Sequence, residues 1–257
     1  MKKKATLLIL NYNGKDLLEE CMPSIVKAVE YDGGGHDIAV VDNNSQDKSI
    51  SFLKTNYPEV KVFPQPKNDY VFSYNNVVKQ LDTDYVIFLN NDIIVAKDFI
   101  APLMAPFIEN DVFAVAAKVL YLDRKTLNYG RRWARFSWGR VLLLTQPDSP
   151  NVLPALVASG GSAVFDCSKF LELEGFDRLY YPFYGEDLDI SYRAWKKGWK
   201  VLYQPRSAFY HRQYGTIGKM VTPFYIATNH ARNNFLFTWK NIIDKPYVIK
   251  HIFFLLP

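Results

Sequence analysis

The first residues that could do chemistry are Asn90, Asn91 and Asp92, which directly follow an apolar run, residues 85–89. A short apolar run rich in β-branched and aromatic residues is typical of a parallel strand buried on both faces. In open α/β sheets ligands bind outside the carboxyl ends of the strands, so a carboxylate and two amides there could bind a ligand or a metal ion. Because Asn and Asp are also ordinary turn formers, a structural turn is the alternative.

Glu186 and Asp187 are a second candidate group, at the start of a segment with helical spacing of apolar residues. A carboxylate can act as a general base, but acidic residues at a helix start also stabilise the helix dipole by about 0.3–1 kcal/mol. Spacing alone therefore assigns neither residue a catalytic role. His211 is a third candidate because histidine binds metal ions, although a lone histidine is more often a hydrogen-bonded structural residue.

Two other predicted strands end in polar side chains. Residues 5–10 lead to Asn11, and residues 38–41 lead to Asp42. Asp42 could accept hydrogen bonds from a ribose or a base, or it could cap a helix. Since the carboxyl ends of parallel strands meet at one edge, we expect Asn11, Asp42 and Asp92 to line that edge.

The patterns around these groups predict the scaffold. Strand and helix patterns alternate over the first hundred residues, which predicts an α/β fold with a doubly wound, mostly parallel sheet and helices on both faces. Further strands are expected at residues 60–63, 199–204 and 208–211, and residues 112–122 are another apolar segment. Helices are expected at 17–29, with Pro23 as a kink or restart, at 47–56, 72–81 and 167–173, and from 186 onward.

Two segments stand out from this alternation. Residues 123–151 mix arginines and tryptophans with two prolines, and we expect a surface loop or flap that could hold a diphosphate, a sugar face or a membrane headgroup. A solvated loop is the alternative. Gly160 and Gly161 lie in an apolar setting, which indicates a close approach of the backbone to another group.

Composition limits the classes of function. With 257 residues, 49% of them hydrophobic and 22% charged, the chain predicts one main globular domain. A net charge of +5 favours anionic ligands or an anionic membrane surface and disfavours nucleic acid as a partner. Cys21 and Cys167 lack metal spacing and fit a reducing, cytosolic compartment. We expect no signal peptide, no bilayer-spanning segment and, without Gly-x-Gly-x-x-Gly, no nicotinamide or flavin cofactor.

Taken together, residues 5–211 resemble the family 2 inverting glycosyltransferases of the GT-A fold, in particular bacterial members that build polysaccharide or lipid-linked glycans, such as rhamnosyltransferases. Each motif alone is weak, whereas their order and spacing together are specific. The motifs are LLILNYNG (7–14), VVDNNSQD (40–47), FLNNDI (88–93), SGGSAVF (159–165), EGFD (174–177), YGEDLDISYRAWKKGWKV (184–201) and YHR (210–212).

The resemblance implies a nucleoside-diphosphate sugar, linked to dTDP or UDP, bound across the first part of the sheet. Asp92 would match the last carboxylate of the family's Asp-x-Asp metal motif, with Asn90 in place of the first, and His211 would be a second ligand to Mg²⁺ or Mn²⁺. Asp187 would be the catalytic base, and Glu186 would support the acceptor. The implied donor-binding residues are Asn11, Asn13, Asp42, Asn44, Asn76, Asn90, Asn91, Gly160 and Gly161.

The implied reaction is a single displacement that inverts the anomeric centre, with a glycan or lipid-linked hydroxyl as acceptor in the synthesis of cell-envelope polysaccharide. A non-catalytic nucleotide-sugar or glycan-binding module on the same fold is one alternative, and Asn90 is the residue that favours it. A nucleotidyltransferase is another, but it would need a basic glycine-rich phosphate loop, which residues 11–14 do not form.

We expect a GT-A catalytic domain over residues 1–216, with a nucleotide-sugar half at 1–110 and an acceptor half at 111–216, followed by a C-terminal helical extension at 217–257. The last apolar stripe is flanked by Lys245, Lys250 and His251. It could lie in a membrane interface or be buried against the domain. The predicted location is cytoplasmic, peripheral at the inner face of the cell membrane.

Overall fold

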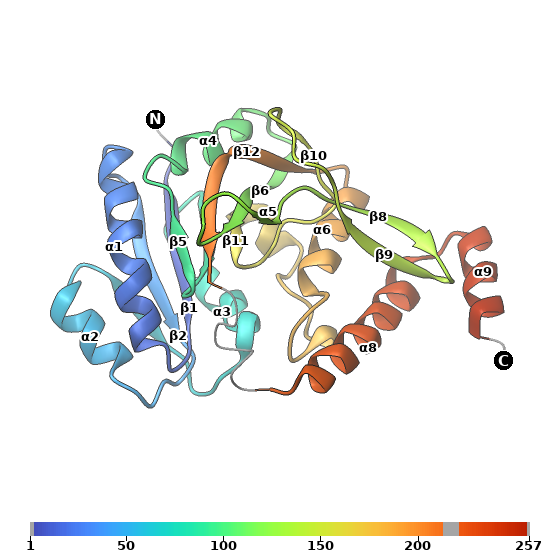
Figure 1. The fold of residues 1–257 in the computed structure, drawn as a ribbon, viewed down its shortest axis with the longest axis horizontal. Coiled ribbons are helices and arrows are strands. Elements are labelled where there is room, and N and C mark those ends of the chain that lie inside the picture. The colour runs from blue at the N-terminus through green and yellow to red at the C-terminus, as the bar shows by residue number, and fades with distance from the viewer. Residues whose placement is uncertain (1–2, 213–220, 256–257) are drawn as a thin grey trace.

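Over residues 3–212 and 221–255, which the computed structural model describes, a ten-stranded sheet runs through the protein with helices on both faces (Figure 1). The strands are β1 Ala5–Asn11, β2 Asp37–Asp42, β3 Lys61–Pro64, β4 Tyr85–Asn90, β5 Ile93–Val95, β6 Val112–Tyr121, β7 Leu127–Tyr129, β8 Arg132–Ser137, β9 Arg140–Thr145, β10 Leu153–Pro154, β11 Ser162–Asp166 and β12 Lys200–His211. The α-helices are α1 Lys15–Tyr31, α2 Ser49–Asn56, α3 Tyr74–Val78, α4 Ile100–Met104, α5 Cys167–Glu172, α6 Glu186–Lys196, α8 Pro223–Asn241 and α9 Lys245–Leu255, and the 3₁₀ helices are η1 Tyr70–Ser73, η2 Ala105–Ile108 and η3 Arg178–Tyr180.

The sheet order is β10-β12-β6-β11-β4-β1-β2-β3, with β5 paired to β12 and β7 to β6. Strands β4, β1, β2 and β3 are parallel, and β11 runs antiparallel to both β4 and β6. The predicted α/β fold with a mostly parallel sheet is confirmed, with β11 as an antiparallel strand inside it. Asn11 pairs with Asp42 and Leu10 with Asn90, so the ends of β2, β1 and β4 lie side by side, as expected.

Strand β4 divides the core between the two faces of the sheet. Val86 and Phe88 pack into one hydrophobic cluster, and Ile87 and Leu89 pack into the other. Phe88 is fully buried, and its ring lies 4.1 Å from that of Tyr74, centroid to centroid. Because both faces are covered, every residue of the run at 85–89 can be apolar, which explains the absence of alternation there.

The prediction of a surface loop over residues 123–151 is wrong in part. Strand β7 joins the main sheet, and β8 and β9 pair as an antiparallel hairpin. Trp138 and Gly139 form its two-residue turn, and both have positive φ, 52° and 64°. A turn with two positive φ values matches the twist of a hairpin, and glycine at the second position adopts it without strain.

Three other expectations need smaller corrections. The helix expected at 72–81 consists of η1 and a short α3, while α1 continues as one helix through Pro23. The two strands expected at 199–204 and 208–211 form one strand, β12, with an irregular register between Gln204 and Ala208. The expected domain boundary at residues 216/217 lies outside the described residues.

Helix α8 packs against α6 through the buried carboxylate of Asp189. Tyr180 Oη donates to it at 2.9 Å, Arg193 Nε at 2.7 Å, Lys240 Nζ at 2.8 Å and Asn241 Nδ2 at 2.9 Å. Both Lys240 and Asn241 belong to α8. The expected C-terminal helical extension thus contains a helix, α8, that packs against the domain, whereas the last apolar stripe belongs to α9.

Replacing Asp189 by Asn should destabilise the fold strongly, because two cations would lose the buried charge that they neutralise. We expect a loss of about 3–5 kcal/mol in the free energy of unfolding, measured by urea denaturation. Asp82→Asn, at an exposed position, should change it by less than about 0.5 kcal/mol. Equal stability of the two variants would contradict the role of Asp189.

Candidate functional site

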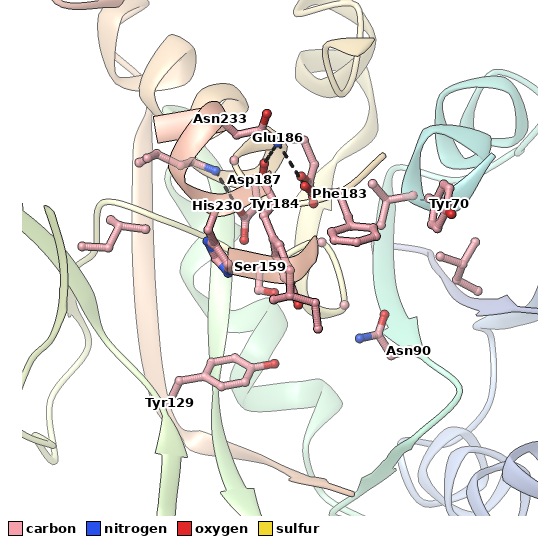
Figure 2. A pocket seen from close by; sticks show the side chains of 18 of the residues that line it. Tyr70, Asn90, Tyr129, Ser159, Phe183, Tyr184, Glu186, Asp187, His230 and Asn233 are labelled. Carbon is pink, nitrogen blue, oxygen red and sulfur yellow. Dashed lines mark hydrogen bonds between the residues drawn. The ribbon is translucent and has the colours of Figure 1, made fainter. Parts of the chain in front are cut away.

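A cavity of about 560 Å³ opens at the carboxyl edge of the sheet (Figure 2). Asp92 after β4, Asp187 in α6 and His211 at the end of β12 all line it, although they are remote from one another in sequence. Residues of the β8–β9 hairpin and of α8 line the same cavity. The structure thus brings together the three residues on which the predicted chemistry depends.

A chain of buried side-chain hydrogen bonds fixes the edge from which Asp92 projects. Asn91 Nδ2 donates to Asn11 Oδ1 at 2.8 Å, and Asn11 Nδ2 donates to Asp42 Oδ1 at 3.0 Å. The other oxygen of Asp42 accepts from the Ser45 amide at 2.9 Å. A Cβ at Gly14 would lie 2.1 Å from Asn91 Nδ2, so this network requires glycine there. Buried polar atoms that are all paired hold the loops after β1, β2 and β4 in one arrangement.

Asp92 and His211 face each other because β5 pairs with β12. His211 lies opposite Ile93 in that pairing, and the Arg212 amide donates to the Asp92 carbonyl oxygen at 3.0 Å. His211 Nε2 consequently lies 3.4 Å from Asp92 Oδ2. Asp92 Oδ1 is buried and has no hydrogen-bond partner among the described residues.

These two side chains fit a hard divalent cation. An unpartnered buried carboxylate oxygen is costly unless a ligand or ion pairs with it. Within residues 3–212 and 221–255 no group of three or more His, Cys, Asp and Glu side chains could hold a metal, and Asp92 with His211 is a pair. Mg²⁺ and Mn²⁺ sites in phosphate-binding enzymes commonly take their other ligands from phosphate and water.

Asn128 is placed to orient His211. Its amide nitrogen, as assigned, lies 3.0 Å from His211 Nδ1. For Nε2 to bind a metal, Nδ1 must carry the proton and donate it, which a half-turn of the Asn128 amide allows because it brings the oxygen to the ring. Such an outer hydrogen bond is the usual means of fixing the tautomer of a ligating histidine.

The start of α6 is held in place from the opposite side by α8. Asn233 is buried, and its Nδ2 donates to the carbonyl oxygens of Phe183 and Tyr184 at 3.0 and 2.6 Å (Figure 2). It also donates to the carbonyl oxygen of Tyr180 at 3.0 Å. Gly185 follows with φ of +101°, a conformation that favours glycine. Glu186 and Asp187 therefore begin the helix in a fixed position beside the cavity.

The surroundings of these two carboxyls differ in their effect on the pKa. It raises the pKa of Glu186 to about 8, with the charge of Asp187 contributing, and Glu186 Oε2 has no hydrogen-bond partner in the described residues. Burial also raises the pKa of Asp187, but the Arg132 charge and the Leu188 amide oppose that rise. The proton is therefore held more strongly on Glu186 than on Asp187, the division needed for one carboxyl of a pair to act as a base.

Sequence reasoning missed two residues near Asp187. His230 of α8 lines the cavity, and its ring stacks on that of Tyr184 at 3.9 Å; burial lowers the pKa of this histidine. Arg132 at the start of β8 also lines the cavity and lies 5.1 Å from the Tyr129 ring. The arginine-rich composition of residues 123–151 signalled Arg132, whereas nothing near His230 in the sequence indicated a site.

The predicted donor-binding residues divide into two groups. Asn90, Asn91, Gly160 and Gly161 line the cavity. A Cβ at Gly161 would lie 2.5 Å from Asn90 Oδ1, so the group that approaches this glycine is Asn90 itself. The residues that are not among those lining the cavity are Asn11, Asn13, Asp42, Asn44 and Asn76. Asp42 is fully enclosed and Asn76 is exposed on α3, and their contacts with a donor stay predictions.

A family model described as Glycosyl transferase family 2 matches residues 6–173. The chain belongs to this family. Members of this family transfer a sugar from a nucleotide-sugar donor. The resemblance noted in the sequence is thereby confirmed, and the match ends before α6, β12 and α8, which supply Asp187, His211 and His230.

Two bacterial rhamnosyltransferases are similar to this glycosyltransferase. The O-antigen chain rhamnosyltransferase RfbN of Salmonella typhimurium is 25% identical over 214 residues, 81% of this chain and 66% of that protein. The N-acetylglucosaminyl-diphospho-decaprenol L-rhamnosyltransferase of Mycobacterium tuberculosis is 24% identical over 229 residues, 78% of this chain and 73% of that one. The chain spans just under two thirds of the length of the Salmonella protein.

Among solved structures, the mannosyltransferase PcManGT from Pyrobaculum calidifontis, in complex with GDP-Man and Mn²⁺, has a TM-score of 0.62 and 13% sequence identity. The likeness covers 99% of this chain and 74% of that one. At this identity it shows the fold, which is the GT-A fold that the sequence predicted.

Glu186 should make stability depend on pH. Its pKa in the folded protein is about 8 against an ordinary 4.5, so between these values the folded chain holds a proton that the unfolded chain loses. Wild-type stability should therefore fall as pH rises through this window. Glu186→Gln cannot ionise, so its stability relative to wild type should grow by about 1 kcal/mol or more from pH 5 to pH 8, measured by urea denaturation.

Glu172→Gln is the control, because Glu172 is exposed in its ion pair with Lys197. Its difference from wild type should stay nearly constant over the same range. If Glu186→Gln behaves in the same way, Glu186 is not the buried, proton-holding carboxyl described above.

Proposed function

We propose that this family 2 enzyme is a metal-dependent inverting transferase that moves a hexosyl or deoxyhexosyl group from a nucleoside-diphosphate donor to a hydroxyl of a glycan or lipid-linked acceptor. The observation that carries the proposal is the convergence of Asp92, Asp187 and His211 on one cavity. Family membership supports transfer chemistry over a nucleotidyltransferase or a module without activity.

Asp92 and His211 would hold Mg²⁺ or Mn²⁺, which fits the unpartnered oxygen of Asp92 and its place 3.4 Å from the imidazole. The bound cation would offset the negative charge that develops on the departing diphosphate. Asn90 stands where a second carboxylate could be, so this site carries less negative charge than a two-carboxylate site. We also propose that Asp92 and His211 are the metal ligands and that the predicted donor-binding residues contact the donor.

Asp187 would act as general base. As the acceptor oxygen bonds to the anomeric carbon, the bond from that carbon to the diphosphate breaks, and the hydroxyl proton passes to the Asp187 carboxylate. Attack opposite the leaving group inverts the configuration. Glu186, with its pKa raised to about 8, would hold a proton beside this base and donate a hydrogen bond to the acceptor.

The names of the relatives support a choice of substrates. The Salmonella and Mycobacterium proteins are rhamnosyltransferases, so a deoxyhexose such as rhamnose, linked to dTDP or UDP, is the donor sugar that we propose first. A lipid-linked or O-antigen-like glycan is the corresponding acceptor. We further propose a nucleotide-sugar half at 1–110, an acceptor half at 111–216 and work at the cytoplasmic face of the cell membrane.

Replacing Asp187 by Asn should lower kcat for sugar transfer by about 10²–10⁴-fold and leave the donor dissociation constant within about twofold, because the base acts only in the transition state. Transfer can be followed by release of the nucleoside diphosphate from a panel of nucleotide sugars. Asp98→Asn, at an exposed position, is the control and should behave as wild type. Equal losses in binding and turnover would mean that Asp187 is not the base.

Replacing His211 by Ala should raise the Mn²⁺ concentration needed for half-maximal donor binding by at least about tenfold, measured by calorimetric titration of nucleoside diphosphate. Asn128→Ala removes only the orienting amide and should have a smaller effect in the same direction. Unchanged metal dependence in His211→Ala would remove this histidine from the cation site.

A further inference from the structure

The β8–β9 turn, the end of α8 and α9 lie together at one end of the molecule (Figure 1). Large apolar side chains are exposed on these segments. Among the described residues nine large apolar side chains are more than half exposed, and three of these, Tyr31, Ile108 and Phe224, lie elsewhere. The remaining six, which we call the α9 face, are Trp138, Trp239, Ile243, Ile249, Ile252 and Phe253. Two thirds of the most exposed apolar side chains thus belong to three neighbouring segments.

Buried His251 joins these segments into one surface. Trp239 Nε1 donates to His251 Nε2 at 2.7 Å, and the opposite ring nitrogen bonds the carbonyl oxygen of Gly139 in the hairpin turn. The Phe136 ring of β8 lies 4.8 Å from the Tyr247 ring of α9. Because α9 is anchored to both α8 and the hairpin, the exposed side chains around it keep their positions.

The outward side of α9 is apolar. Ile249, Ile252 and Phe253 are spaced i, i+3 and i+4, which places them together on the side of the helix away from Tyr247 and His251. They are 53%, 53% and 69% exposed. Helix α9 has 11 residues, whereas a span needs about 20, and none of the helices among the described residues could cross a bilayer. An apolar stripe on so short a helix suits a position in the plane of a membrane interface.

The charge around the α9 face indicates which kind of partner it binds. Residues 131–145 and 223–255 contain eight Lys and Arg but only one Asp or Glu, Asp244, whereas the rest of the chain has 23 Lys and Arg against 25 Asp and Glu. Three of the eight act elsewhere, since Arg132 lines the cavity, Arg232 bonds the Tyr181 carbonyl oxygen and Lys240 pairs with Asp189. The α9 face draws its positive charge from the others. Lys245 and Lys250 of α9 are both exposed. A basic region around an apolar stripe is complementary to anionic lipid headgroups above acyl chains. A second copy of the chain would bring the same positive charge to the contact and be repelled.

We propose that the α9 face docks on the surface of an anionic lipid bilayer. Ile249, Ile252, Phe253 and Trp138 enter the boundary between headgroups and acyl chains, and Lys245 and Lys250 lie at the headgroup phosphates. This binding goes beyond the proposed reaction, since it needs neither donor nor acceptor. A lipid-linked acceptor would then meet an enzyme already held at the membrane.

Sedimentation with vesicles tests the proposal without reference to activity. Wild-type protein should bind vesicles of phosphatidylcholine and phosphatidylglycerol, and bind poorly to phosphatidylcholine alone. The double variant Ile252→Asp/Phe253→Asp should bind at least about tenfold more weakly. Lys245→Glu/Lys250→Glu should also lose at least about tenfold, because each lysine contributes about fivefold near an anionic surface.

The controls are Ile108→Asp, at an 87% exposed position in η2, and Lys48→Glu/Lys79→Glu, at exposed positions outside the face; both should bind vesicles as wild type does. Thermal unfolding verifies that the variants fold. Absence of binding by wild type, or equal losses in face and control variants, overturns the proposal. A wild-type dimer that Ile252→Asp/Phe253→Asp converts to monomer would overturn it in favour of self-association. Release of diphosphate in solution, measured in parallel, tests the proposed reaction separately.

Discussion

The buried carboxylate of Asp189 is the interaction on which the site most depends. It receives four hydrogen bonds, two of them from the cations Arg193 and Lys240, and it is fully enclosed. A buried charge is tolerated only when it is paired and fully hydrogen-bonded, so α6 and α8 must stay together for the fold to be stable. That constraint places Asp187 on α6 beside His230 on α8, and it closes one side of the cavity.

The opposite side is built on a different principle. At the carboxyl edge of the sheet the hydrogen bonds join two amides and one carboxylate. Asn91 donates to Asn11, and Asn11 donates to Asp42, across three strand ends. The two networks hold different parts of the site. The edge network aims Asp92 toward the partner His211 that β5–β12 pairing supplies, and the Asp189 network holds the carboxyl pair of α6 across from them. The hydrogen bonds described for both networks join groups of the protein itself, which is how the supporting residues of a site hold it in position.

Much of the sheet and of its carboxyl edge could be predicted, because the pattern that indicates each strand is local in the sequence. The run at 85–89 is uniformly apolar since β4 is covered on both faces, and that run fixed the position of Asp92 at the sheet edge. Parallel pairing then brought Asn11 and Asp42 to the same edge. The convergence of Asp187 and His211 on Asp92 was predicted from the resemblance to a family and not from spacing. The local sequence at a helix start or a strand end does not indicate which residues will be its tertiary neighbours.

The remaining features depend on tertiary contacts that leave little trace in the sequence. The β8–β9 hairpin was not predicted, because its two turn residues are Trp138 and Gly139 and not the usual Asn-Gly. His230 lies in the cavity because α8 is held in place through Lys240 and Asn241, which bond Asp189, and through Asn233, which bonds the segment before α6. The hydrogen bonds of Asp42 to Asn11 and to the Ser45 amide within the edge network were likewise not predicted, and its contact with a donor stays a prediction.

A crystal structure with a nucleoside diphosphate and Mn²⁺ tests the central claim most directly. The account predicts one cation bound by Asp92 and His211 at about 2.0–2.2 Å, with the diphosphate in the same cavity and Asp187 across from it. A cation and diphosphate bound elsewhere, with Asp92 and His211 free of both, would contradict the account.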